Sequence, residues 1–234
     1  MVNNMQVKEF YDQLGFPGMY TKADLDSYGD PIANLYLRRI DQELGSDQLV
    51  LDAGCGTGLT TNLFALRYPT SRFVGIDFAR SIDRARDFAR ENRINNVSFL
   101  KQDLSRGRHA PIYDRIICQG VLHHIPNYVG AAHRLSEALA PGGRLIVGLY
   151  HPAGKWLKRF TKINYGSSIL EQDQEANPFE LAFTPQQAQA LFPDLTLVSL
   201  GPNLFGSTSL AALANSKSGG LTIYVFEKAQ NEVD

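Results

Sequence analysis

The chain has little of several features that would assign it to a specialised class of protein. Its 234 residues include only two cysteines, too few for a disulfide framework. The formal net charge of −1 provides no overall basic field to collect nucleic acid. No apolar run reaches the length of a membrane span, and the first residues lack an apolar signal core. We therefore expect a cytoplasmic protein without a membrane span that does not act on nucleic acid.

Apolar strands alternate with helices through most of the chain. The predicted strands are 48–54, 72–77, 96–103, 113–120, 144–150, 195–201 and 221–229. The predicted helices are 7–15, 31–44, 58–69, 79–93, 128–143 and 184–193. Such alternation indicates βαβ units, and hence an α/β fold with a doubly wound, mainly parallel sheet and helices on both faces.

A glycine-rich loop follows the first strand in LVLDAGCGTGLTT, residues 49–61. Gly54, Gly56 and Gly58 stand at alternate positions, where glycine permits positive φ and lets a ligand approach the main chain. A phosphate loop would need a lysine, and none occurs here. A dinucleotide fingerprint would need glycine or alanine at Leu59. A ligand-free glycine turn is the remaining alternative, whereas VLDAGCGTG resembles the first motif of class I S-adenosylmethionine-dependent methyltransferases.

Two further motifs extend this resemblance in the family's order. CQGVLHHIPN, residues 118–127, resembles the family's fourth motif, and LAPGGRLIVGLY, residues 139–150, resembles its turn into the fifth strand. The resemblance implies a seven-stranded sheet of order 3-2-1-4-5-7-6 and S-adenosylmethionine as cofactor. We expect one methyltransferase domain, divided into an N-terminal helical cap (1–45), a cofactor-binding core (46–150), an insertion or lid (151–183) and a closing helix with two strands (184–234).

Carboxylates at strand ends are the main candidate cofactor ligands. Asp77 is placed to accept the ribose hydroxyl hydrogens, or alternatively to cap the next helix. The resemblance implies that Asp103 pairs with the adenine amino group, that the Leu104 N–H meets the ring, and that Asp52 holds the glycine loop or the amino acid part. Capping is again the alternative for Asp103. The full predicted cofactor set is Tyr11, Tyr20, Asp52, Gly54, Cys55, Gly56, Gly58, Asp77, Phe78, Asp103, Leu104, Gln119 and Gly120.

His123 and His124 follow the fourth strand, beside the expected position of the transferred methyl group. Either one is a candidate general base, because the pKa of histidine lies near neutral pH; packing or capping is the alternative. His151 is a weaker candidate. Cys55 and Cys118 are interpreted as small buried residues rather than nucleophiles. No metal site is predicted.

The acceptor is predicted to be a small molecule, methylated by in-line transfer as in quinone-methylating relatives. The Asp/Asn-Pro-Pro-aromatic and Pro-Cys motifs of DNA methyltransferases are missing after the fourth strand. Aromatic residues outside the core are expected to close the pocket or to form a helical core: Phe10, Tyr11, Phe16, Tyr20, Trp156, Phe160 and Tyr165. Lys155, Lys158, Arg159 and Lys162 either attract an anionic acceptor or form a solvated helix face.

Three other functions remain open on the sequence alone. The first is a regulatory protein that binds S-adenosylmethionine without catalysis. The second is a nucleotide-dependent oxidoreductase, which the spacing of the glycines disfavours. The third is transfer of another group from an altered sulfonium compound.

Overall fold

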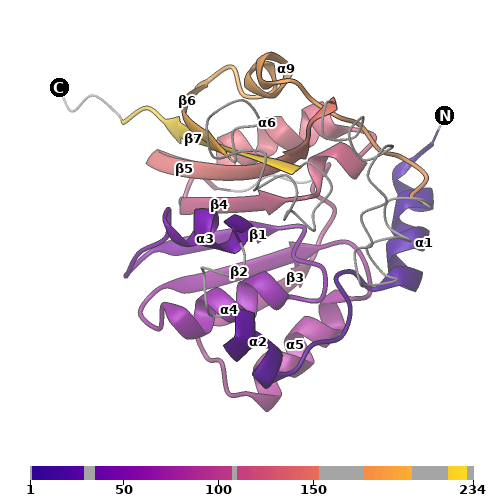
Figure 1. Ribbon diagram of the computed structural model, residues 1–234, viewed down its shortest axis with the longest axis vertical. Helices are drawn as coiled ribbons and strands as arrows, with labels where there is room; N and C mark the ends of the chain where they lie inside the picture. The colour runs from indigo at the N-terminus through magenta and orange to yellow at the C-terminus, as the bar shows by residue number, and fades with distance from the viewer. Residues whose placement is uncertain (1, 29–34, 107–109, 153–176, 202–220, 231–234) are drawn as a thin grey trace.

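A single seven-stranded sheet organises the computed structural model, which describes residues 2–28, 35–106, 110–152, 177–201 and 221–230 (Figure 1). The strands are β1 (Leu49–Ala53), β2 (Arg72–Asp77), β3 (Val97–Lys101), β4 (Tyr113–Gln119), β5 (Leu139–Tyr150), β6 (Leu195–Gly201) and β7 (Leu221–Lys228). Their order is β3-β2-β1-β4-β5-β7-β6. The first five strands pair in parallel, and β7 is antiparallel to both of its neighbours. The predicted fold class and strand order are therefore confirmed.

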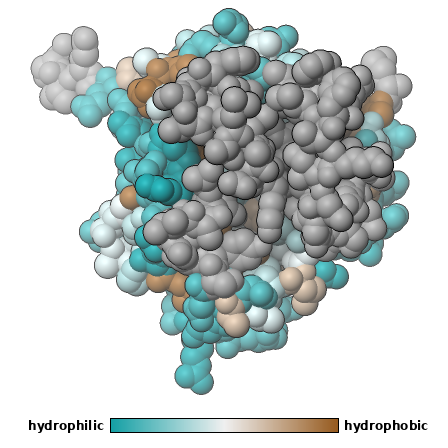
Figure 2. Space-filling view, in the orientation of Figure 1, coloured by the Kyte–Doolittle hydropathy of each residue, from teal (hydrophilic) through white to brown (hydrophobic). Residues whose placement is uncertain are grey.

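Helices cover both faces of this sheet. They are α1 (Asn4–Leu14), α2 (Lys22–Tyr28), α3 (Leu35–Asp41), α4 (Leu59–Arg67), α5 (Ile82–Glu91), the 3-10 turn η1 (Leu122–His124), α6 (Tyr128–Ala138) and α9 (Pro185–Ala190). Neighbouring residues of a strand point to opposite faces. Accordingly, Val50 belongs to the core under α2, α3, α4 and α5, and Leu51 to the core under α6 and α9. In Figure 2 the surface over α2 and α5 is mostly hydrophilic, as expected for helices that bury only their inner faces.

Helix α1 stands across the end of the sheet to which the parallel strands point (Figure 1). Asn3 begins the helix with a capping box, in which its side chain accepts the N–H groups of Met5 and Gln6 and the Gln6 side chain accepts the Asn3 N–H. Gly15 ends the helix in the left-handed conformation, with φ 60°. Because ligands of doubly wound sheets bind at the carboxyl ends of the strands, α1 lies over the expected site.

Two segments differ most from the sequence-based expectation. Residues 22–28 form α2 where we expect no helix; Thr21 begins it, with Thr21 Oγ1 accepting the Asp24 N–H and the Asp24 carboxylate accepting the Thr21 N–H. Strand β5 begins at Leu139, five residues before the predicted start, because Leu139 pairs with Tyr113 ahead of a register shift. The expected helix 128–143 accordingly ends at Ala138.

The described part of the chain contains no helix long and apolar enough to cross a membrane. The division into cap, core, lid and closing segments stays a prediction. Residues 153–176 of the expected lid, which include Trp156, Phe160, Tyr165 and the four basic residues, lie outside the described residues.

Candidate cofactor and acceptor site

The glycine loop between β1 and α4 requires glycine for two separate reasons. Gly54, Gly56 and Gly58 have φ of 84°, 56° and 80°, a region that other residues rarely adopt. In addition, a Cβ at Gly54 would lie 2.4 Å from a methyl carbon of Val121, and one at Gly56 would lie 2.3 Å from the Phe16 carbonyl oxygen. The space freed by the missing side chains is thus filled by the protein itself.

Main-chain hydrogen bonds hold this loop against the end of β2. The N–H groups of Gly54 and Cys55 both donate to the Ile76 carbonyl oxygen, at 2.7 and 3.1 Å. The Gly56 N–H donates to Asp77 Oδ2 at 2.9 Å. The loop is therefore anchored to the strand that carries the predicted ribose ligand.

Asp52 is a buried carboxylate at the end of β1. Its side chain accepts a hydrogen bond of 2.6 Å from Thr61 Oγ1 on α4. Burial raises the pKa of Asp52 to about 7; the Thr61 hydrogen bond opposes this, and the charge of Asp77 adds to it. In the described part of the chain, no cationic side chain bonds to Asp52 or Asp77. The carboxyl ends of β1 and β2 thus carry two acidic side chains that have no bonded cation among the described residues.

Asp77 and Asp103 both cap the turns that follow their strands. Asp77 Oδ1 accepts the Ala79 N–H at 2.8 Å, and burial raises its pKa despite this bond and the one from Gly56. Asp103 Oδ1 accepts both the N–H and the hydroxyl of Ser105, at 2.8 and 2.7 Å. The capping alternative is therefore observed for Asp103. Asp77 caps the turn before α5 but not the helix itself, whose N-cap is Ser81. The ligand roles of both residues stay predictions.

The other predicted cofactor residues lie around this loop. Phe78 and Gln119 are half-buried, and Cys55 and Leu104 are buried. Gly120, at the end of β4, has φ 72°, and a Cβ there would meet nothing within 4 Å. Of the positive-φ glycines in the site, Gly120 is thus the one that faces open space.

Tyr20 fastens the N-terminal segment to the glycine loop. Its hydroxyl donates to the Thr57 carbonyl oxygen at 2.9 Å and accepts from Asn62 Nδ2 at 2.8 Å. Its ring lies against Phe88, with the centroids 4.5 Å apart. Burial raises the pKa of Tyr20 to about 12, so the hydroxyl remains protonated at neutral pH. In this structure, Tyr20 supports the loop from outside.

The two candidate histidines form one buried aromatic cluster with Tyr150. The His123 ring lies 4.1 Å from the Tyr150 ring and 4.2 Å from the His124 ring, centroid to centroid. His124 Nδ1 is 3.0 Å from the Phe179 carbonyl oxygen. A carbonyl only accepts, so in the neutral ring Nδ1 carries the proton and Nε2 carries the lone pair. The hydrogen bond with Phe179 thus sets the tautomer that His124 would need as a base.

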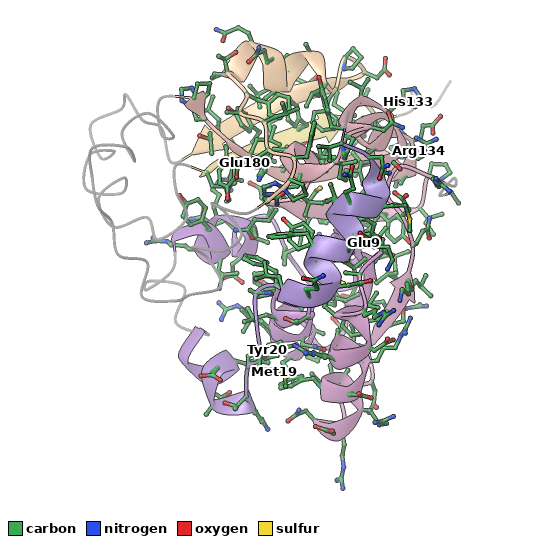
Figure 3. All side chains as sticks on the ribbon, turned by 90° about the vertical axis from the view of Figure 1, so that its right-hand side faces the viewer. Glu9, Met19, Tyr20, His133, Arg134 and Glu180 are labelled. Carbon is green, nitrogen blue, oxygen red and sulfur yellow. The ribbon has the colours of Figure 1, made fainter. Side chains whose placement is uncertain are left out.

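Helix α1 and residues 177–183 frame this cluster. The Tyr11 ring lies 6.1 Å from the His124 ring, and its hydroxyl accepts from Asn177 Nδ2 at 2.8 Å. The Leu181 N–H donates to the His123 carbonyl oxygen at 2.9 Å. The predicted residues Tyr11, His123 and His124 are thus brought together by segments far apart in sequence. Figure 3 looks onto this end, with α1 in front, Tyr20 below and Glu180 above.

Sequence reasoning missed Asn4, Thr61, Asn177 and Phe179. Of these residues, only Thr61 could have been found from the sequence. It lies in the first helical turn after the glycine loop, and its side chain bonds to Asp52. Asn177 and the Phe179 carbonyl reach the site through the tertiary fold, which no local pattern encodes.

The weaker candidates have less support. His151 is partly buried, and this burial lowers its pKa. Cys118 is fully buried, and burial raises the pKa of its thiol, so its interpretation as a buried structural residue fits. Among the residues that the structure describes, no group of three or more His, Cys, Asp or Glu side chains is arranged to hold a metal ion.

Residues 44–194 match the model of a methyltransferase domain, which is more than half of the chain. The chain belongs to this family. The resemblance to class I S-adenosylmethionine-dependent methyltransferases is confirmed, and S-adenosylmethionine is the cofactor that membership implies.

Named relatives and a solved structure agree with this assignment. The chain is 31% identical over 134 residues to trans-aconitate 2-methyltransferase of Methylobacterium nodulans, covering 55% of this chain and 49% of that protein. It is 32% identical over 115 residues to malonyl-[acyl-carrier protein] O-methyltransferase of Acetivibrio thermocellus, covering 49% and 40%. The chain thus spans about half the length of the first of these relatives, and less of the second.

The fold is shared with N-methyltransferase NodS from Bradyrhizobium japonicum, solved in complex with S-adenosyl-L-homocysteine. The TM-score is 0.64 at 20% identity, covering 95% of this chain and 98% of that one. At this level of identity the likeness extends to the fold alone.

Proposed function

We propose that this methyltransferase domain transfers the methyl group of S-adenosylmethionine to a small-molecule acceptor. The observation that carries the proposal is a pair of carboxylates beside the glycine loop. Asp77 accepts the Gly56 N–H of the loop, and Asp52, just before the loop, accepts the Thr61 hydroxyl just after it. No cationic side chain of the described residues bonds to either carboxylate. A ligand with a positively charged sulfur supplies the charge that this place lacks.

The residues at the strand ends fit the parts of such a cofactor. Asp77 is proposed to accept the ribose hydroxyls, and Asp103 the adenine amino group, because each is a carboxylate at a carboxyl end of the sheet. Gly120, which follows β4, adds an open position at the same edge of the sheet. When bound, S-adenosylmethionine supplies an activated methyl group, so the main task of the chain is to align the acceptor and exclude water.

A small carboxylic acid is the acceptor class to test first. The two relatives are named for trans-aconitate and for a malonyl group, both of which are carboxylic acids. A carboxylate oxygen has no proton to lose at neutral pH, so its methylation needs no general base. For an acceptor that keeps its proton, His124 is the proposed base, because the Phe179 carbonyl fixes its tautomer.

Calorimetry with S-adenosylmethionine, S-adenosylhomocysteine and NAD tests the cofactor assignment. Both sulfur compounds should bind and NAD should not. Asp77→Ala should lose affinity for the nucleosides, whereas Asp87→Ala, on the exposed face of α5, should not. Binding of NAD alone would favour an oxidoreductase and overturn the proposal.

Release of S-adenosylhomocysteine from a panel of acceptors tests catalysis. The panel pairs each carboxylic acid with the corresponding alcohol. With carboxylates, His124→Ala should change turnover little; with alcohols, it should lower turnover by about 10²-fold or more. His123→Ala serves as the neighbouring comparison. Cofactor binding without turnover on any acceptor would favour the regulatory alternative.

A further inference from the structure

The N-terminal segment bonds to three different loops at the carboxyl ends of the strands. Asn4 at the start of α1 reaches the loop after β3, and Asp12 near its end accepts the Arg80 N–H at 2.6 Å in the loop after β2. Farther along, the Phe16 carbonyl oxygen accepts the Thr57 N–H of the glycine loop at 3.0 Å. One continuous segment therefore covers the places where the cofactor is proposed to bind.

Asn4 donates a hydrogen bond to Oδ2, the second carboxylate oxygen of Asp103. Its Nδ2 lies 3.2 Å from Asp103 Oδ2 and 2.6 Å from Ser105 Oγ. Ser105 donates twice to Oδ1, and the exposed Arg106 side chain pairs with Oδ2 at 3.6 Å, so both oxygens of the carboxylate are already engaged. The side-chain amide of Asn4 is an N–H₂ donor, as is the exocyclic amino group of adenine. An amino group that approaches this oxygen competes directly with Asn4.

Helix α1 is held mainly by such polar contacts. Val7 is the buried residue of the helix, and Met5 beside it is 60% exposed. Elements with little apolar burial open locally at a small cost in free energy. Separation of α1 from the sheet exposes one fully buried apolar side chain, Val7, parts the half-buried Tyr11 ring from His124, and breaks a few identifiable hydrogen bonds.

We propose that α1 is a latch over the adenine end of the cofactor site, and that Asn4 closes it by bonding to Asp103. This proposal rests on the proposed function, because it takes the ligand to be an adenine nucleoside. The latch must open before the cofactor enters, and the adenine amino group then takes the place of the Asn4 amide. The population of the open form limits the association rate.

Association kinetics of S-adenosylhomocysteine test the latch. Asn4→Ala should raise the association rate constant by about tenfold, because the bond to a charged carboxylate no longer holds the closed form. The dissociation rate constant should change much less, because Asn4 has left Asp103 in the bound form. Glu9→Gln, on the exposed face of the same helix, is the matched control and should leave both constants unchanged (Figure 3).

Hydrogen exchange of the ligand-free protein gives a second measurement that does not depend on binding. Residues 4–14 should exchange faster in Asn4→Ala than in Glu9→Gln. Faster exchange with an unchanged association rate would overturn the gating role, and unchanged exchange would overturn the latch itself. If neither the wild type nor Asn4→Ala binds the nucleoside, the proposed function fails together with the latch; binding by Asn4→Ala alone would support both.

Discussion

At the scale of single residues, Asp52 links the fold to the proposed ligand. Its buried carboxylate has a pKa of about 7, so it changes charge within the physiological range. Protonated Asp52 offers no charge to a sulfonium, whereas ionised Asp52 attracts it. Because the product of methyl transfer has a neutral sulfur, the protonation state of this residue should affect cofactor and product differently.

The ratio of product to cofactor dissociation constants should therefore depend on pH. From pH 6 to pH 8 we expect S-adenosylmethionine to gain about 5- to 20-fold over S-adenosylhomocysteine, the effect of one unit charge at roughly 10 Å in a partly screened site. Calorimetry measures both constants. In Asp52→Asn the ratio should be flat with pH, and an unchanged pH trend in that variant would assign the titration to another group.

Gly54 tests whether the loop needs glycine for its φ or for its packing. Gly54→Ala adds a Cβ 2.4 Å from Val121, whereas Gly120→Ala adds one in open space at a similar positive φ. We expect Gly120→Ala to cost about 1–2 kcal/mol of unfolding free energy from conformation alone. Gly54→Ala should cost about 1–3 kcal/mol more from the clash.

Urea unfolding of the single and double variants separates these two costs. Val121→Ala removes the methyl carbons that clash, so the double variant with Gly54→Ala should be more stable than the sum of the single effects predicts. Additive effects would mean that backbone strain alone accounts for the glycine.

At the scale of elements, the sequence predicts the sheet well because each strand is a compact apolar run between clear turn signals. β2 matches residue for residue, and the strand order follows from the family resemblance. The predicted start of β5 is wrong, because residues 139–143 join the strand through the pairing of Leu139 with Tyr113. Helix α2 is not predicted from the sequence, because glycine and aromatic residues precede its Thr21–Asp24 capping box.

The candidate site is predictable only in part, because some of its contacts join residues that lie far apart in the sequence. Carboxylates and glycines at strand ends carry a local signal, so Asp52, Asp77 and the loop can be located from sequence. Asn4 bonds to Asp103 across 99 positions of sequence, and Asn177 bonds to Tyr11 across 166. Contacts of that separation depend on where the helices finally dock, and no periodicity in the sequence encodes them.

Tyr20 should stabilise the glycine loop from the N-terminal segment. Tyr20→Phe removes the hydroxyl shared by Thr57 and Asn62, so we expect a loss of about 1–2 kcal/mol in unfolding free energy. Hydrogen exchange in residues 54–58 should also become faster. Met19→Ala is the control, since Met19 is 79% exposed next to Tyr20 (Figure 3). Equal exchange rates in the two variants would show that the Tyr20 hydroxyl does not stabilise the loop.

At the scale of the whole molecule, an ion network ties the sheet together at the end opposite the site. The Glu43 carboxylate pairs with Arg39 of α3 at 2.6 Å and with Arg144 of β5 at 2.9 Å. Arg144 also pairs with Glu227 of β7 at 2.7 Å, and Arg115 of β4 donates to the Glu43 carbonyl oxygen. Glu43 thus connects helix α3 with strands β4 and β5 directly, and with β7 through Arg144.

This network should make part of the stability depend on pH. Burial raises the pKa of Glu43, but its hydrogen bonds to Arg39 and Arg144 outweigh burial and lower it below the ordinary value of 4.5. A carboxyl group with a lowered pKa stabilises the fold above its unfolded pKa and loses that contribution as pH falls through the folded value. Glu43→Gln should therefore cost about 1–2 kcal/mol at pH 7 and distinctly less near pH 3.

Urea unfolding at both pH values measures this difference, with Asp87→Asn as the matched control. Asp87 pairs with Arg90 on the exposed face of α5, where ion pairs contribute little, so its penalty should stay below about 0.5 kcal/mol at either pH. A Glu43→Gln penalty no larger than that of the control, or one that does not shrink in acid, would show that apolar packing alone joins α3 to the strands. A penalty that shrinks as expected would show that Glu43 forms a pH-sensitive ionic link at the end of the sheet remote from the proposed chemistry, separate from the titration of Asp52 beside the glycine loop.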